Sequence, residues 1–187
     1  MEETPLVKGD IISGQTCISN KNMIHELEQK GYGEIEKEKL FLKQFETLYL
    51  LYAKRLILKK SNKQIDFNSF MSLSQKTNPE ILTKFLIYRD LRNRGYVVKD
   101  GFGFGSDFRV YERGHFGEKG AKFLIFGLNE GQQEKMGNLQ KKIEEITQMG
   151  KEPIIAVIER RGEIIYYKIN IMNFNENKAR LEESFQL

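Results

Sequence analysis

The strongest signal for the fold lies in residues 88–114, which read Tyr88-Arg-Asp-Leu-Arg-Asn-Arg-Gly95-Tyr-Val-Val-Lys99-Asp-Gly101-Phe-Gly-Phe-Gly105-Ser-Asp107-Phe-Arg-Val-Tyr111-Glu-Arg-Gly114. Its first part continues an apolar pattern of helical spacing that starts at Asn78-Pro79-Glu80, where Asn can cap a helix and Pro suits the first helical position. Gly95 is expected to end this helix. The β-branched and aromatic residues that follow predict strands over 96–99 and 104–112.

Three more strand-like runs follow toward the C-terminus, over 122–128, 154–159 and 163–169. A polar, helix-permissive segment over 133–149 separates the first of these runs from the second. A helix, three strands, a helix and two strands are typical of an α/β domain built around a mixed sheet. We therefore predict a C-terminal α/β domain over 78–187, with a mixed five-stranded sheet.

The first 77 residues have a different pattern and predict a small α+β domain over 1–77. Strand formers and turns over 5–19 indicate a hairpin, and a helix is expected over 20–30, where Gly31 would stop it. Apolar residues at three- and four-residue steps predict another helix over 40–56. A small basic cluster then follows, and we expect it to be a solvated loop; it contains Arg55, Lys59, Lys60 and Lys63.

The composition excludes or disfavours several classes of protein and of functional site. The chain has 187 residues, of which 30 are Lys or Arg and 26 are Asp or Glu, so the net charge of +4 permits a polyanionic partner without requiring one. The single cysteine, Cys17, excludes an intramolecular disulfide and a cysteine-based zinc site. Two histidines disfavour a His-rich metal centre. No apolar run approaches the roughly 20 residues of a membrane span, so we expect a protein of the cytoplasm.

The 88–114 stretch resembles the catalytic domain of the archaeal tRNA-splicing (tRNA-intron) endonucleases. The pattern of that family is roughly Y-x-D-L-R-x-[KR]-G-[YF]-x-V-[KR]-x-G-x-K-[FY]-G-x-D-F-x-V-Y-x-x-G, and this chain matches nearly all of it. Two later blocks, over 151–158 and 162–169, are also similar to family blocks. Near the N-terminus, Gly31-Tyr32-Gly33 and Leu48-Tyr49-Leu50 resemble family elements, so the resemblance covers most of the chain.

The resemblance implies a metal-independent and cofactor-free RNA lyase. In such enzymes the ribose 2′-OH attacks the neighbouring phosphate, giving a 2′,3′-cyclic phosphate and a 5′-OH. A Tyr suits the role of general base, a His can protonate the leaving 5′-oxygen, and a Lys can stabilise the charge that develops on the phosphoryl oxygens. His suits the acid role because its ordinary pKa, about 6.5, is near the working pH.

Two of these three residues have counterparts here. Tyr111 matches the family Tyr, although an ordinary sheet aromatic is the alternative, and Lys151 matches the family Lys, although a loop lysine is the alternative. The position of the family His is occupied by Gly120, or by Ala121 if the loop differs by one residue, and neither can donate a proton. His115 is the candidate for a substitute acid, with an exposed turn residue as the alternative.

Some charged residues near this site favour RNA binding, and one opposes it. We expect Arg109 and Arg113, the two cations nearest Tyr111, to be candidates for RNA binding. An Arg that grips RNA in the family corresponds here to Glu144, and a carboxylate at this position opposes the approach of phosphate. The missing His and this charge reversal together indicate a degenerate catalytic site.

The resemblance also implies partners. Family enzymes consist of four catalytic-type units, and in the heterotetramers one kind of subunit is structural. We therefore predict a structural subunit that binds precursor tRNA and a homologous catalytic subunit, and that self-associates through the edge strand Glu163 to Ile169. Glu130 is a candidate for the acidic loop that docks two dimers. The alternatives are a catalytic homo-oligomer with a rearranged acid, and another RNA-binding or nuclease role on the same fold.

Overall fold

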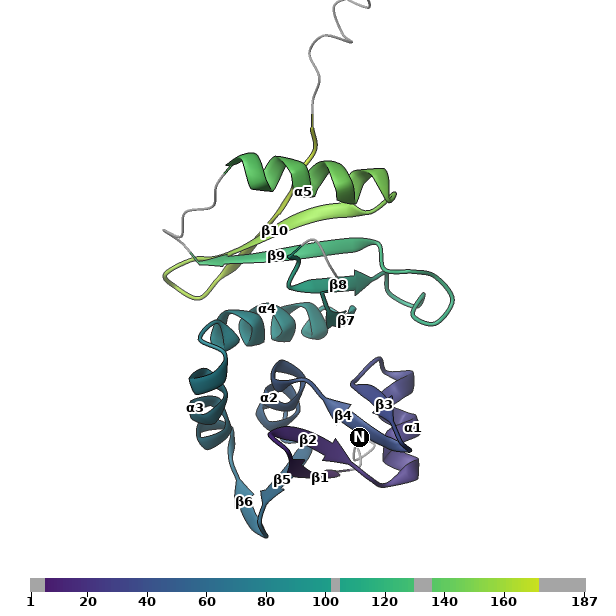
Figure 1. Cartoon of the computed structure of the whole chain (residues 1–187), viewed down its shortest axis with the longest axis vertical. Helices are drawn as coiled ribbons and strands as arrows, with labels where there is room; N and C mark the ends of the chain where they lie inside the picture. Colours follow the sequence, from purple (N-terminus) through teal and green to yellow (C-terminus); the bar gives the residue numbers. More distant parts are fainter. Residues whose placement is uncertain (1–5, 102–104, 130–135, 172–187) are drawn as a thin grey trace, which may run out of the picture.

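Two β-sheets with two helices packed between them, one from each half of the chain, form the architecture (Figure 1). The computed structural model describes residues 6–101, 105–129 and 136–171, and the side chains of 136–139 are not described. In these residues the chain places a six-stranded sheet before residue 66 and a five-stranded sheet after residue 96. None of the helices in the described ranges is both long and apolar enough to cross a lipid bilayer.

The N-terminal sheet has the strand order β3-β4-β2-β1-β5-β6. Its strands pair antiparallel, except for β1 and β5, which pair in parallel. The elements of this half are β1 (Val7–Ile12), β2 (Gln15–Ile18), α1 (Lys21–Gln29), β3 (Glu34–Glu36), β4 (Lys39–Leu42), α2 (Gln44–Tyr52), β5 (Leu56–Lys60), β6 (Lys63–Ile65) and α3 (Phe67–Thr77).

The C-terminal sheet has the strand order β11-β10-β9-β8-β7 and confirms the expected mixed five-stranded sheet. Its one parallel pair among the described strands is β9 with β10. The elements are α4 (Ile81–Asn93), β7 (Val97–Asp100), β8 (Phe108–Tyr111), β9 (Phe123–Asn129), α5 (Met136–Gln148), β10 (Glu152–Ile158) and β11 (Ile164–Lys168). The helices α4 and α5 cover opposite faces of this sheet (Figure 1).

The prediction of one helix over 40–56 is wrong at its start. Leu40 and Leu42 are buried at alternate positions of strand β4, and the helix begins only at Gln44. The carboxylate of Glu46 accepts the backbone N–H of Lys43 over 2.8 Å, which starts the helix in the manner of a capping box. The chain therefore turns between strand and helix at Lys43.

The three lysines of the basic cluster lie in an antiparallel hairpin of β5 and β6 and not in the loop that we expected, while Arg55 lies in the connection before β5. Leu56 and Leu58 alternate into the core and hold β5 against β1. Ser61 and Asn62 both have positive φ, 48° and 66°, which is the backbone of a two-residue hairpin turn. The hairpin places its lysines at the end of the ladder.

Helix α4 begins two residues later than its sequence signal predicts. Asn78 accepts the backbone N–H of Glu80 through its side chain, and its carbonyl accepts the N–H of Ile81, so this signal forms a turn ahead of the helix. At the other end, Gly95 has a φ of +85° and follows the helix as expected.

One hydrophobic core extends through both halves, and α4 lies at its centre. Tyr88 of α4 is fully buried, and its ring centroid lies 4.9 Å from Phe45 of α2 and 6.1 Å from Phe108 of β8. Each aromatic pair contributes roughly 0.5–1.5 kcal/mol beyond the burial of its area. The hydroxyl of Tyr88 has no hydrogen-bond partner among the described residues, and burial raises the pKa of this phenol well above its ordinary value.

A buried carboxylate holds the loop of the N-terminal half to which the C-terminal half is bonded. Glu46 accepts the backbone N–H of Gly33 over 2.9 Å as well as that of Lys43. Burial raises the pKa of Glu46, while these two bonds and the nearby charges of Lys99 and Arg92 oppose the increase. Lys99 of β7 donates to the carbonyl of Gly33 over 2.5 Å, so the C-terminal sheet is tied to the loop that Glu46 holds.

The unpaired hydroxyl at the centre of the core gives a test of this packing. Tyr88→Phe removes a buried group without a partner, and such a group costs about 1–3 kcal/mol, so we expect an equal or higher free energy of unfolding. Tyr88→Ala leaves a cavity and is expected to lower the free energy of unfolding by about 3–5 kcal/mol. Urea unfolding of both variants measures this. A loss of stability in Tyr88→Phe as large as in Tyr88→Ala would contradict the account.

Candidate functional site

The candidate catalytic residues lie at the ends of three neighbouring strands of the C-terminal sheet. Tyr111 is the last residue of β8, Gly120 and Ala121 precede β9, and Lys151 precedes β10. Backbone bonds align these ends, because Lys122 N–H donates to the carbonyl of Val110 and Glu152 N–H donates to that of Lys122, each over 2.9 Å. The register therefore brings three segments distant in sequence to one edge of the sheet.

Lys151 lies beside Gly120 and Ala121, one of which we predict to occupy the position of the family His. Its Nζ donates to the carbonyl of Ala121 over 2.6 Å, and the amine is half-buried. A Cβ built on Gly120 would meet Nζ of Lys151 at 3.9 Å, an ordinary van der Waals contact, and no other atom closer. The backbone of Gly120 is also outside the left-handed region, so this exposed position has room for a side chain.

Tyr111 is packed against an aromatic side chain of the following loop. Its ring meets that of Phe116 edge-on, with the centroids 5.0 Å apart and the planes at 90°. Phe116 in turn lies against the N-terminal half, since a Cβ on Gly31 would come within 3.3 Å of its ring. Tyr111 therefore takes part in the packing that holds this loop between the two halves.

Arg109 lies further along β8, next to the seam between the two halves. It pairs with Lys99 on one side and with Leu124 on the other, and its side chain is half-buried. Its Nε is buried without a hydrogen-bond partner among the described residues. Side chains alternate along this strand, and Phe108 and Val110 are buried on the opposite face.

His115 and Arg113 belong to a different cluster from Lys151. They line an open hollow of about 360 Å³ with Tyr96, Glu112 and Phe123. Nδ1 of His115 lies 3.8 Å from a carboxylate oxygen of Glu118, and the guanidinium carbon of Arg113 lies 4.8 Å from the centroid of the Tyr96 ring.

Within this cluster, Glu112 forms an ion pair with Lys122. The hydrogen bond from Lys122 lowers the pKa of Glu112, and the same bond raises the pKa of Lys122. No hydrogen bond or ion pair joins His115 to Tyr111 or Lys151 in the described part of the chain.

Helix α5 places two acidic residues near the C-terminal sheet. Glu144 is exposed, and its carboxylate accepts a hydrogen bond from the amide of Gln140 over 3.0 Å. Its neighbour Glu145 is half-buried. Glu130, the candidate for the acidic docking loop, lies outside the described residues.

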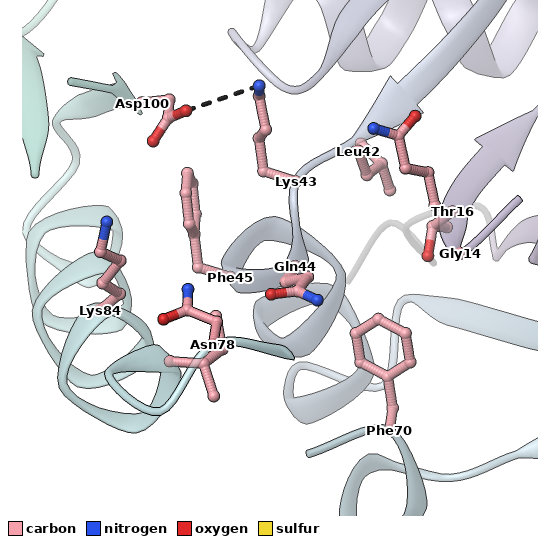
Figure 2. Close-up of a pocket in the computed structure, with 12 residues that line it drawn as sticks. Gly14, Thr16, Leu42, Lys43, Gln44, Phe45, Phe70, Asn78, Lys84 and Asp100 are labelled. Carbon is pink, nitrogen blue, oxygen red and sulfur yellow. Dashed lines mark ion pairs between the residues drawn. The ribbon is translucent and has the colours of Figure 1, made fainter. Parts of the chain in front are cut away.

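A pocket between the two halves was not predicted from the sequence (Figure 2). It has a volume of about 290 Å³, and Lys43, Gln44 and Phe45 at the start of α2 face Asn78 and Lys84 across it. Nζ of Lys43 lies 3.5 Å from a carboxylate oxygen of Asp100, and Nζ of Lys84 lies 3.1 Å from one of Asp107. Its lining comes from segments far apart in sequence, so no local pattern could have indicated it.

Comparisons with known proteins agree with this architecture. Residues 81–166 match the sequence profile of the tRNA intron endonuclease catalytic C-terminal domain, and residues 7–71 match that of the tRNA intron endonuclease N-terminal domain. The chain is also similar to proteins named tRNA-splicing endonuclease. The one from Methanococcus vannielii is 31% identical over 156 residues, which are 83% of this chain and 88% of the relative.

Two further relatives with the same name come from other archaea. The protein of Pyrococcus furiosus is 30% identical over 78% of this chain and 84% of its own length. The protein of Thermococcus onnurineus is 30% identical over 87% of this chain and 95% of its own length. The similarity therefore extends over both halves of the structure.

Proposed function

Because this chain belongs to the tRNA intron endonuclease family, we propose that it is the structural, non-catalytic subunit of a tRNA-splicing endonuclease. Family membership supports tRNA splicing as the process in which it acts. The structural role is carried by one observation, the absence of any side chain at Gly120, beside Lys151. We propose the cytoplasm as its location and 1–77 and 78–187 as its two domains.

The proposed reaction of the whole enzyme needs a proton donor at that position. Attack of the 2′-OH on phosphorus expels the 5′-oxygen, which must gain a proton as the P–O bond breaks, leaving a 2′,3′-cyclic phosphate and a 5′-OH. A positioned general acid typically contributes 10²–10⁴-fold to such a step. Glycine and alanine have no group that could take this role, so a catalytic partner subunit has to supply the acid.

Packing supports the same conclusion for the two family positions that are retained. Tyr111 contacts Phe116 and Lys151 holds the carbonyl of Ala121, so each has a structural reason to be present. The exposed carboxylate of Glu144 also opposes phosphate, because phosphate affinity depends largely on Lys and Arg contacts.

The alternative is a catalytic homo-oligomer in which His115 replaces the missing acid. One observation favours it, since the open hollow beside Glu112 makes His115 accessible. In this alternative, Arg109 and Arg113 would bind the RNA and Tyr111 would keep its role as base. The two readings differ in whether this chain cleaves RNA without a partner.

The edge of the C-terminal sheet supports association with a further subunit. Strand β11 is bonded to β10 on one side, and no described strand pairs with its other side. Ile165 and Tyr167 point outward from this strand and are 37% and 49% exposed. An open edge with exposed apolar side chains is suited to pairing with a second chain. We propose that residues 163–169 form such a contact.

Cleavage assays distinguish the structural subunit from the catalytic homo-oligomer. Labelled precursor tRNA is incubated in EDTA with this chain alone, with a homologous catalytic subunit, and with the variant Gly120→His. We expect no cleavage by the wild-type chain alone and cleavage by the mixture. Because Gly120 has room for an imidazole beside Lys151, Gly120→His alone should produce detectable cleavage, since a positioned general acid typically contributes 10²–10⁴-fold.

Lys119→His is the matched control, since it places an imidazole one residue away on the same exposed loop. It should leave the chain inactive. Cleavage by the wild-type chain alone that disappears in His115→Ala would establish the alternative. A Gly120→His chain as inactive as Lys119→His would contradict the assignment of Gly120 to the family His position.

A substitution that places a charge on the open edge strand β11 tests the proposed self-association. Tyr167→Lys should shift the chain from dimer to monomer in light scattering, because it places a charge in the apolar contact. Ile35→Lys is the control, since Ile35 is 45% exposed on β3, the edge strand of the other sheet. Unchanged mass in Tyr167→Lys, or equal dissociation in both variants, would count against the edge contact.

A further inference from the structure

The hairpin of β5 and β6 projects from the N-terminal sheet, at the end of the molecule distant from the C-terminal sheet (Figure 1). Three pairs of residues join its strands, namely Leu58 with Ile65, Lys59 with Gln64 and Lys60 with Lys63. The turn residues Ser61 and Asn62 both have positive φ, so the tip has a defined two-residue geometry. The backbone positions that carry the side chains of the tip are therefore fixed.

The tip carries three lysines, and residues 59–65 include no acidic residue. Lys59, Lys60 and Lys63 are exposed, and none forms an ion pair with another described residue. Lys60 and Lys63 are directly opposite each other, an arrangement in which Cβ atoms are about 4.5–5.5 Å apart and like charges destabilise the sheet. Asp10 is opposite Lys59 on β1, but the two side chains form no ion pair.

A second hairpin of the same sheet shows that this arrangement is particular to β5 and β6. The β3–β4 hairpin carries Lys37 and Lys39, but these alternate with Glu36 and Glu38. Glu36 is directly opposite Lys39, so unlike charges face each other there. Of the two hairpins, only that of β5 and β6 presents an unbalanced cationic surface.

We propose that the β5–β6 hairpin binds the phosphate backbone of the precursor tRNA outside the splice sites. This inference rests on the proposed function, which supplies an RNA substrate. Lysines are point charges that contact phosphate without reading sequence, and no aromatic ring lies among residues 59–65 for stacking on bases. The hairpin is far from the edge of the C-terminal sheet that carries Tyr111 and Lys151, so it is a surface separate from the candidate site of this chain (Figure 1).

The test measures affinity for mature tRNA, which has no intron and cannot be cleaved. Fluorescence anisotropy of labelled tRNA is recorded over a range of salt concentrations with the wild-type chain, Lys60→Gln/Lys63→Gln and the control Lys37→Gln/Lys39→Gln. Loss of two phosphate contacts should weaken binding about three- to tenfold at low salt and reduce the salt slope of log K by about 2. The control should bind like the wild type.

Two further readouts keep the outcomes distinct. A minimal bulge–helix–bulge RNA should be cleaved equally by complexes that contain the wild type or the hairpin variant, and the unfolding midpoint should not change. Undetectable binding of tRNA by the wild-type chain, or equal affinity and slope in the two double variants, would overturn the proposal. Loss of association with the catalytic subunit in the hairpin variant would instead assign the hairpin to a protein contact. Because the tRNA assay involves no cleavage, failure of the structural-subunit role does not affect its result.

Discussion

Tyr88 packs between Phe45 and Phe108, and this contact joins the two halves of the molecule. Helix α4 has one face on the C-terminal sheet and another on α2 of the N-terminal half, so a single side chain contributes to both. The carboxylate of Glu46 and the ammonium of Lys99 then hold the loop at Gly33 against this core. With the two halves joined in this way, the interdomain pocket and the seat of Phe116 against Gly31 have fixed shapes.

The candidate site is held in place by the packing of the two halves and by backbone hydrogen bonds, and not by interactions among its candidate catalytic groups. Backbone bonds from Lys122 and Glu152 align the strand ends, and Lys151 is satisfied by the carbonyl of Ala121. A side chain at Gly120 would point to open space beside Lys151, so its absence leaves no buried cavity and costs no packing. An acid can therefore be lost here while the fold and its surfaces for partners remain, which is what a structural subunit requires.

The fold of the C-terminal half could be predicted because its signals are local. Gly95 ends a helix, and strand runs rich in β-branched residues give all five strands of the sheet. The start of α2 could not be predicted, since its capping carboxylate binds a backbone N–H at Lys43, a residue that is not a usual cap. The alternation of Leu56 and Leu58 and the turn at Ser61-Asn62 were available signals for β5 and β6. The interdomain pocket and the neighbours of His115 depend on tertiary packing, which no local pattern encodes.

Single-turnover cleavage of precursor tRNA by two complete enzymes tests whether this chain supplies catalytic groups. One complex contains this chain as wild type, and the other contains it as Tyr111→Phe/Lys151→Met, each with the same homologous catalytic subunit. We expect equal cleavage rates, because the general base, the general acid and the cation that stabilises charge on the phosphate all come from the partner subunit. A rate lower by about 100-fold or more in the variant complex, with unchanged assembly, would place catalytic groups in this chain and contradict the account.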